Sequence, residues 1–149
     1  MARILVVDDE PDIRRLLDTV LTDEGHEVTL AQDGQHALEI MLKEPPDVLV
    51  LDIMMPRLDG YGVLKEMRYA GLRESTKILM LSAKNYEADW LRGYKHGAHQ
   101  YLTKPFDPDE LVESINKLLG MSHEQLSAHT ERELDRAQLL SRLESLFNK

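Results

Sequence analysis

Short apolar runs alternate with amphipathic stretches along most of the chain, and this alternation restricts the folds that are open to it. The runs expected to form strands are residues 4–7, 27–31, 47–51, 78–81 and 100–103. The stretches with helical spacing that follow them are residues 11–24, 37–42, 61–69, 86–96 and 107–119. Strict alternation of this kind predicts an α/β fold, a doubly wound five-stranded parallel sheet with helices on both faces.

Composition excludes several classes of protein. The chain has 149 residues, a hydrophobic content of 42%, a formal net charge of −9 and no cysteine. A negative charge without a basic patch argues against nucleic acid or an anionic membrane as a partner of this chain. Since no apolar run approaches the ~20 residues of a membrane span, we expect a soluble, cytoplasmic protein.

Polar side chains stand where the predicted strands end. Asp8 and Asp9 follow the first strand, and Asp52 follows the third. Ser82 follows the fourth strand and Lys104 the fifth. Ligands of parallel sheets bind outside the carboxyl ends of the strands, so these five side chains are expected to converge on one crevice.

This set of groups is suited to phosphoryl transfer. Clustered carboxylates repel one another unless a cation enters, and oxygen ligands in a crevice with few protein donors suit Mg²⁺. Lys104 supplies a compact positive charge, and Ser82 supplies a rotatable hydroxyl. With the metal they would neutralise charge on the transferred group, and Asp52 would be the nucleophile that forms an acyl phosphate.

Four motifs resemble the receiver domain of two-component response regulators, the family that includes the chemotaxis regulators. They are VVDDE (6–10), VLVLDIMMPRLDGY (48–61), LMLSAK (79–84) and YLTKPF (101–106). The resemblance covers roughly residues 2–120 and implies a flavodoxin-like sheet with strand order 2-1-3-4-5. It divides the chain into a receiver domain, residues 1–120, and a helical extension or linker, residues 121–149.

The resemblance also assigns roles at the strand ends. Asp52 would accept a phosphoryl group from the phosphohistidine of a sensor histidine kinase or a phosphotransfer protein. Asp8, Asp9 and Asp52 would hold Mg²⁺, for which Mn²⁺ could substitute, together with the backbone carbonyl of Met54. The protein would then be a phosphoacceptor rather than an enzyme, assisting its own phosphorylation and slow dephosphorylation.

The same resemblance implies a conformational switch. Ser82 and Lys104 would contact the phosphoryl group, and a cis peptide bond between Lys104 and Pro105 would aim the lysine into the crevice. Ser82 and Tyr101 would be the switch residues, Tyr101 being the aromatic side chain whose rotamer reports the state. Alternatively, Tyr101 is simply an aromatic side chain buried in the core beside its strand.

Two flanking residues bear on how long the phosphoryl group lasts. Met54 and Lys84 lie two positions after Asp52 and Ser82. Neither side chain is suited to orienting an attacking water, so we expect a long-lived phosphoryl group. The alternative reading as a Mg²⁺-dependent aspartyl-phosphate phosphatase usually needs a general acid two residues after the nucleophile, where this chain has Met54. A third reading, a constitutive scaffold, has no need of clustered charge.

Residues 121–149 have a different character. Ser122 to Gln125 and Thr130 to Glu133 both match a capping box, the signature of a helix start. The helix expected from Glu131 carries an apolar stripe, formed by Leu139, Leu140, Leu143, Leu146 and Phe147. So short a helix is marginal alone and should bury its stripe on the receiver itself, a second chain or a target.

Partner surfaces are expected on two elements. Trp90 and Tyr94 of the helix 86–96 and the apolar stripe Leu139, Leu143, Leu146 and Phe147 are candidate contacts. A homodimer could form through the face made by residues 86–96, 100–103 and 107–119 or through the C-terminal helix, and the downstream protein target stays open. The six histidines lack metal-binding spacing and are expected at the surface. Thirty residues are too few for a DNA-binding domain, so the chain is either a single-domain regulator or a fragment whose output domain is missing.

Overall fold

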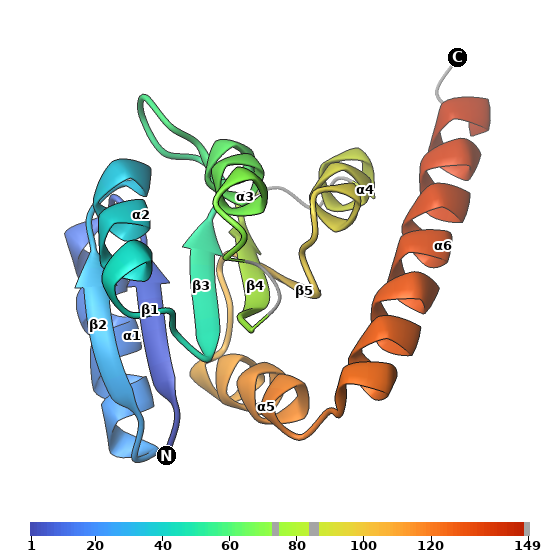
Figure 1. Cartoon of the computed structure of the whole chain (residues 1–149). Helices are drawn as coiled ribbons and strands as arrows, with labels where there is room; N and C mark the ends of the chain where they lie inside the picture. The colour runs from blue at the N-terminus through green and yellow to red at the C-terminus, as the bar shows by residue number, and fades with distance from the viewer. Residues whose placement is uncertain (73–74, 84–86, 148–149) are drawn as a thin grey trace.

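The sheet has the predicted strand order. The computed structural model describes residues 1–72, 75–83 and 87–147, and from 87 to 90 only the backbone. The strands are β1 (Arg3–Val7), β2 (Glu27–Ala31), β3 (Val48–Asp52), β4 (Lys77–Ser82) and β5 (Gln100–Thr103). They are parallel in the order β2-β1-β3-β4-β5 (Figure 1), which confirms the flavodoxin-like arrangement.

Helices cover both faces of the sheet. They are α1 (Pro11–Asp23), α2 (Gly34–Lys43), α3 (Gly60–Tyr69), α4 (Glu87–Lys95), α5 (Pro108–Leu119) and α6 (His123–Phe147). The first five lie where the apolar spacing predicts them. Within the described ranges, no helix combines the length and the hydropathy that a membrane span requires.

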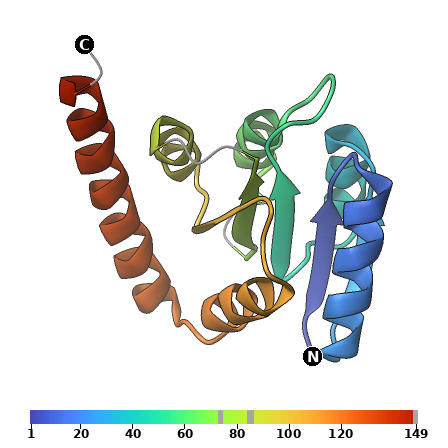
Figure 2. The same cartoon turned by 180° about the vertical axis from the view of Figure 1, so that it is seen from behind.

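Two hydrophobic cores separate the layers, because successive strand residues point to opposite faces. Ile4 and Val6 of β1 face α1 and α5, whose buried residues include Leu17 and Leu111. This is the side turned toward the viewer in Figure 2. The other face packs against α2, α3 and α4, and the buried residues of that core include Ala137 of α6. The C-terminal helix therefore belongs to the folded body.

A close backbone contact shapes the connection from β3 to α3. Gly60 begins α3, and its N–H donates to the carbonyl of Ile53 at 2.9 Å. A Cβ atom at this position would lie 2.7 Å from the carbonyl oxygen of Asp52. The loop that follows Asp52 can therefore fold back against the strand end because residue 60 has no side chain.

The start of α6 confirms one predicted capping box. The N–H of Gln125 donates to Oγ of Ser122 at 3.1 Å, and the N–H of Ser122 donates to Oε1 of Gln125 at 2.9 Å. The second box is wrong, because α6 continues through Thr130 without a break. The hydroxyl of Thr130 instead donates to the carbonyl of Leu126, as it does inside a helix.

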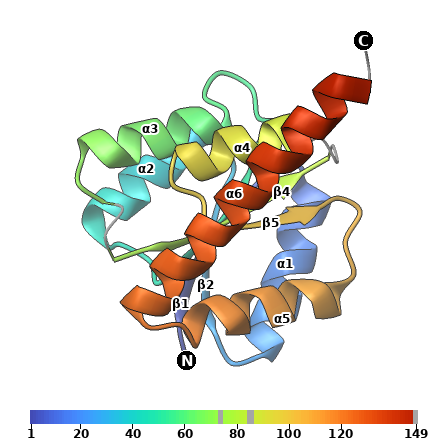
Figure 3. The same ribbon diagram turned by 90° about the vertical axis from the view of Figure 1, so that its right-hand side faces the viewer.

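α6 lies across α4 and β5, so that it docks on its own receiver (Figure 3). Its apolar residues divide between two sides. Ala137 is buried, whereas Leu139, Leu143, Leu146 and Phe147 are all exposed. Leu140, predicted in the same stripe, instead lines a hollow beside Tyr94 and Tyr101.

Two surface predictions need correction. The spacing of α4 places Tyr94 on the inward face of that helix, and Tyr94 was also expected to be a partner contact. Its side chain is only 6% exposed, in the core that includes Ala137, which confirms the inward position and makes the partner contact wrong. His129 was expected at the surface, but it is buried where α6 meets β5. Docking of α6 explains both differences. The other predicted contact on α4, Trp90, has a side chain outside the described part of the chain.

Candidate functional site

Four carboxylates meet at the carboxyl ends of β1 and β3. One oxygen from each of Asp8, Asp9, Glu10 and Asp52 lies within 4.8 Å of the others. Asp8 and Asp52 are buried, at 0% and 2% exposure, whereas Glu10 is exposed. The strand-end argument therefore placed three of these residues correctly. It gave no role to Glu10, although that residue is the last of the quoted VVDDE motif.

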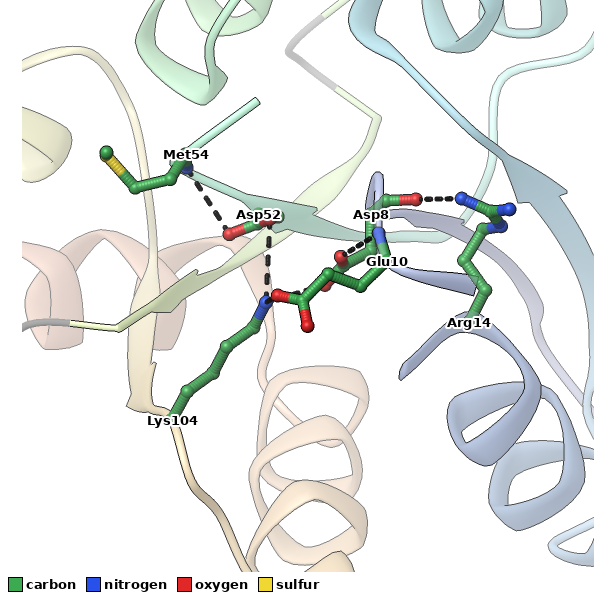
Figure 4. Close-up of polar contacts among 6 residues, drawn as sticks. All are labelled: Asp8, Glu10, Arg14, Asp52, Met54 and Lys104. Atoms are coloured by element: carbon green, nitrogen blue, oxygen red, sulfur yellow. Dashed lines mark hydrogen bonds and ion pairs between the residues drawn. The ribbon is translucent and has the colours of Figure 1, made fainter. Parts of the chain in front are cut away.

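Lys104 brings a positive charge into the cluster. Its Nζ lies 2.8 Å from Oδ2 of Asp8 and 3.5 Å from Oδ2 of Asp52 (Figure 4). A third contact, of 3.4 Å, reaches Oε1 of Glu10. The side chains of Lys104, Asp8 and Asp52 are 12%, 0% and 3% exposed, so the charges of these three residues interact with little screening by water.

The pKa of Asp52 is shifted mainly because the carboxyl group is buried. Burial raises the pKa of Asp52, and the negative charge of Asp8 raises it further. The Lys104 ammonium and the N–H of Met54 lower the pKa, but the balance leaves it at about 7. Near neutral pH the carboxyl group therefore exchanges readily between its charged and neutral forms. A bound cation would favour the charged form.

The connection from β1 to α1 is held in place by its own polar groups. The N–H of Glu10 donates to Oδ1 of Asp8 at 2.9 Å. The guanidinium of Arg14 donates to the backbone carbonyl of Asp8 at 2.6 Å (Figure 4). Arg14 was not predicted, because a single arginine in the first turns of a helix carries no sequence signal of its own.

The remaining predicted residues lie around this cluster. Ser82 is buried at the end of β4 and pairs in register with Thr103 of β5. The N–H of Lys104 donates to the carbonyl of Ser82 at 2.6 Å. The peptide bond between Lys104 and Pro105 is cis, as the resemblance implied. Tyr101 is buried, and its ring meets that of Tyr94 edge to face at 5.2 Å.

Two further predictions have different outcomes. Met54 is 60% exposed, and its N–H donates to Oδ1 of Asp52 at 3.3 Å. Its carbonyl as a metal ligand stays a prediction. Lys84 lies outside the described residues.

The donor set fits a hard divalent cation. The four clustered side chains all offer carboxylate oxygens, the ligands preferred by Mg²⁺. Two of them are buried, and Lys104 is the one lysine that contacts them in the part of the chain that the structure describes, so among these residues negative charge exceeds positive charge. A cation beside Asp8 and Asp52 would relieve that repulsion.

Comparison with known proteins gives a consistent result. The family model for the response regulator receiver domain matches residues 4–116. The probable transcriptional regulator ycf27 of Cyanophora paradoxa is 50% identical over 118 residues, which are 78% of this chain and 48% of that protein. The chain thus spans about half the length of the curated relatives it matches.

Solved structures agree with the fold. The chemotaxis protein CheY4 of Vibrio cholerae superposes with a TM-score of 0.76 at 35% identity, covering 79% of this chain and 98% of that one. The response regulator TrrA of Thermotoga maritima, solved in complex with Mg²⁺ and BeF, gives a TM-score of 0.70 at 40% identity, covering 79% and 99%.

Proposed function

This chain belongs to the response regulator receiver domain family, and on that premise we propose that Asp52 accepts a phosphoryl group from a histidine kinase or a phosphotransfer protein. The observation that carries the proposal is the position of the Lys104 ammonium between the buried carboxylates of Asp8 and Asp52. A buried carboxylate beside a cluster of acidic side chains and one lysine is a costly arrangement for stability alone. With a bound divalent cation to offset its negative charge, the cluster would be suited to receiving an anionic group.

In the proposed reaction, a carboxylate oxygen of Asp52 forms a bond to phosphorus as the bond from phosphorus to the donor histidine nitrogen breaks. The imidazole leaves with the electron pair of that bond. Lys104 lies close enough to contact the incoming phosphoryl oxygens, and the Ser82 hydroxyl would contact a second one. The chain's own contribution is therefore position and charge.

Mg²⁺ would be held by Asp8, Asp9 and Asp52, with the backbone carbonyl of Met54 as a further ligand and Mn²⁺ as a substitute. When bound, the ion supplies positive charge that offsets the negative charge of the transferred group. The related TrrA, solved with Mg²⁺ and BeF, supports this choice. The carboxylate cluster of this chain supports it independently.

The chain would act as a stoichiometric acceptor rather than as a turnover enzyme. The phosphatase reading would place a general acid two residues after the nucleophile, and Met54 is an exposed thioether there. Met54 and Lys84 also give no carboxylate or amide to orient a hydrolytic water. The phosphoryl group would accordingly be long-lived.

The output would be a change of conformation passed to a protein partner. Ser82, the last residue of β4, and Tyr101, within β5, would be the switch residues. The relatives named as transcriptional regulators are about twice as long as the matched region. We therefore propose that this receiver controls transcription in the cytoplasm through a separate output domain, since the chain itself has no basic surface signal for DNA.

Mass spectrometry after incubation with acetyl phosphate and Mg²⁺ tests the acceptor role. We expect one added phosphoryl group on the wild type and none on Asp52→Asn. EDTA should abolish the modification, because the cluster would lose its cation. Modification of Asp52→Asn to the same extent, or repeated turnover of a phosphate monoester by the wild type, would contradict the proposal.

A further inference from the structure

The face formed by α4 and β5 is already occupied by a helix of the same chain. Tyr94 of α4 and Tyr101 of β5 are 6% and 7% exposed. Ala137 of α6 is 2% exposed and belongs to the same apolar cluster, with Leu134 packed against it. Figure 3 shows α6 crossing this face from one end to the other. Residues of α6 therefore cover the part of this face where the two tyrosines lie.

A partly buried polar contact joins α6 to β5. Nε2 of His129 lies 2.9 Å from Oε1 of Gln100, and His129 is only 3% exposed. Since His129 is buried, loss of Gln100 as its partner would leave the imidazole without this hydrogen bond, which is costly. This contact therefore fixes the position of α6 along β5, in addition to the apolar packing at Ala137.

The turn before α6 is anchored as well. Nζ of Lys77, at the start of β4, donates to the carbonyls of Leu118 and Met121 at 2.7 and 3.0 Å. The capping box of Ser122 and Gln125 closes the first turn of α6. These contacts keep the base of α6 beside its own receiver. They identify the chain's own α6, rather than that of a second copy, as the occupant of the face.

Tyr101 lies in a narrow space between α4 and α6. On one side is Gly93, where an added Cβ would lie 1.6 Å from the tyrosine hydroxyl oxygen. The ring can take this position because α4 has no side chain there. On the other side, Arg136, Ala137 and Leu140 of α6 line the hollow beside the ring. Outward rotation of Tyr101 would bring it against α6.

We infer that α6 is an intramolecular cap that holds Tyr101 buried and keeps the α4–β5 face closed to other proteins. A partner that binds this face has to displace α6 first. The cap is a property of the folded chain and needs no phosphoryl group. It adds a level of control to the proposed acceptor function, because the face beside the proposed switch residue Tyr101 is exposed only when α6 leaves.

Nitration with tetranitromethane, mapped by peptide mass spectrometry, tests the cap on the full chain. Tyr69 is 77% exposed and serves as the reactive standard. Tyr61, a residue of α3 that is 5% exposed and has Arg92 of α4 over its ring, reports global folding. In the wild type we expect Tyr69 to react at least tenfold faster than Tyr94 and Tyr101. Equal rates at Tyr101 and Tyr69 would overturn the inference.

Two alanines of α6 give a matched pair of variants. Ala137 is buried in the apolar cluster that contains Tyr94 and Tyr101, whereas Ala128 is exposed. Ala137→Glu should raise the nitration rate of Tyr94 and Tyr101 about tenfold while Tyr61 stays protected, and Ala128→Glu should leave all rates unchanged. Identical rates in the two variants would overturn the inference. If Ala137→Glu also exposes Tyr61, Gln100→Ala decides, because it removes the polar contact without burying a charge. Faster reaction at Tyr101 supports the cap, and an unchanged rate overturns it.

Discussion

The ammonium nitrogen of Lys104 lies 2.8 Å from a carboxylate oxygen of Asp8, although 96 positions separate the two residues in the sequence. Asp8 has no solvent exposure, and the lysine side chain is 12% exposed. This ion pair joins the ends of β1 and β5 across the site. Because the pair is mostly shielded from water, removal of the lysine leaves the buried Asp8 carboxylate without the ion pair that compensates its charge.

Lys104→Met should therefore destabilise the metal-free protein by about 3 kcal/mol. Added Mg²⁺ should restore much of the lost stability, because the cation would balance the negative charges of Asp8 and Asp52 in place of the lysine. Urea denaturation in EDTA and in Mg²⁺ measures both effects. Lys65→Met, at an exposed position of α3, is the control and should change stability little. Equal losses for the two variants would show that the ion pair contributes nothing.

The raised pKa of Asp52 makes stability depend on pH. The ordinary pKa of an aspartate is 3.8, and that of Asp52 in the folded protein is about 7. Between these pH values the folded protein therefore binds the proton more readily than the unfolded chain does. Stability in EDTA should consequently fall as the pH rises through this range. Asp52→Asn removes the cost of the buried charge and should raise Tm at pH 8 by roughly 4 °C or more.

At pH 5 the difference in Tm between Asp52→Asn and the wild type should shrink, because the wild-type carboxyl group is then largely neutral. Asp135→Asn, at an exposed position of α6, should show no such pH-dependent difference. Thermal denaturation followed by circular dichroism measures each curve. A constant difference from pH 5 to pH 8 would mean that Asp52 is not the titrating group.

The strands and the site could be predicted because one regularity governs both. Buried parallel strands have continuous apolar sequences, so a polar residue at the end of each run is conspicuous. Asp52 after VLVL and Lys104 after YLT were found in this way, and topology brings such strand ends to one edge. Glu10 was missed because it stands beyond the strand end, where an exposed acid is ordinary.

The position of α6 could not be predicted for a different reason. Helical periodicity shows that a helix has an apolar side but not which element covers it. The stripe led to Leu139 and Leu143, which are exposed. The docked side instead includes a small residue and a polar one, Ala137 and His129, together with leucines. Burial of Tyr94 followed from this docking. Tertiary contacts of that kind leave no local pattern.

The close contact at Gly60 leads to a further prediction. A Cβ at this position would meet the carbonyl oxygen of Asp52 at 2.7 Å, and both atoms belong to backbone that cannot easily move. Gly60→Ala should destabilise the protein by about 1–3 kcal/mol and slow modification of Asp52. Gly120→Ala is the control, since its φ of −78° suits alanine and its nearest neighbour is 3.4 Å away. Urea denaturation of both variants should separate them clearly.

The exposure of Met54 bears on the lifetime of the phosphoryl group. Its side chain is 60% exposed, and its N–H donates to Asp52, so a polar group there would lie near the modified carboxylate. Met54→Glu should shorten the lifetime by about tenfold or more, because a carboxylate can orient or activate water. Met54→Leu should leave it unchanged. Loss of the phosphoryl label over time measures the effect, and equal lifetimes would exclude position 54 from control of hydrolysis.

The buried contact of His129 should make docking of α6 sensitive to acid. Burial lowers the pKa of His129, and the positive charge of Lys117 on α5 lowers it further. Arg132 acts in the same direction, whereas Glu133 and the backbone of His99 oppose it. The folded state therefore binds a proton less readily than the unfolded chain. Stability from this contact is present above pH ~6.5 and is lost as the pH falls below it.

Hydrogen exchange of α6, corrected for the intrinsic effect of pH, measures this dependence. Amides of residues 123–147 should lose protection between pH 7.5 and pH 5.5 in the wild type. His129→Gln, which keeps a neutral polar group beside Gln100, should show a smaller loss over the same range. His123→Gln changes an exposed histidine of the same helix and should behave as the wild type. If all three proteins respond alike, protonation of His129 does not control the docking of α6.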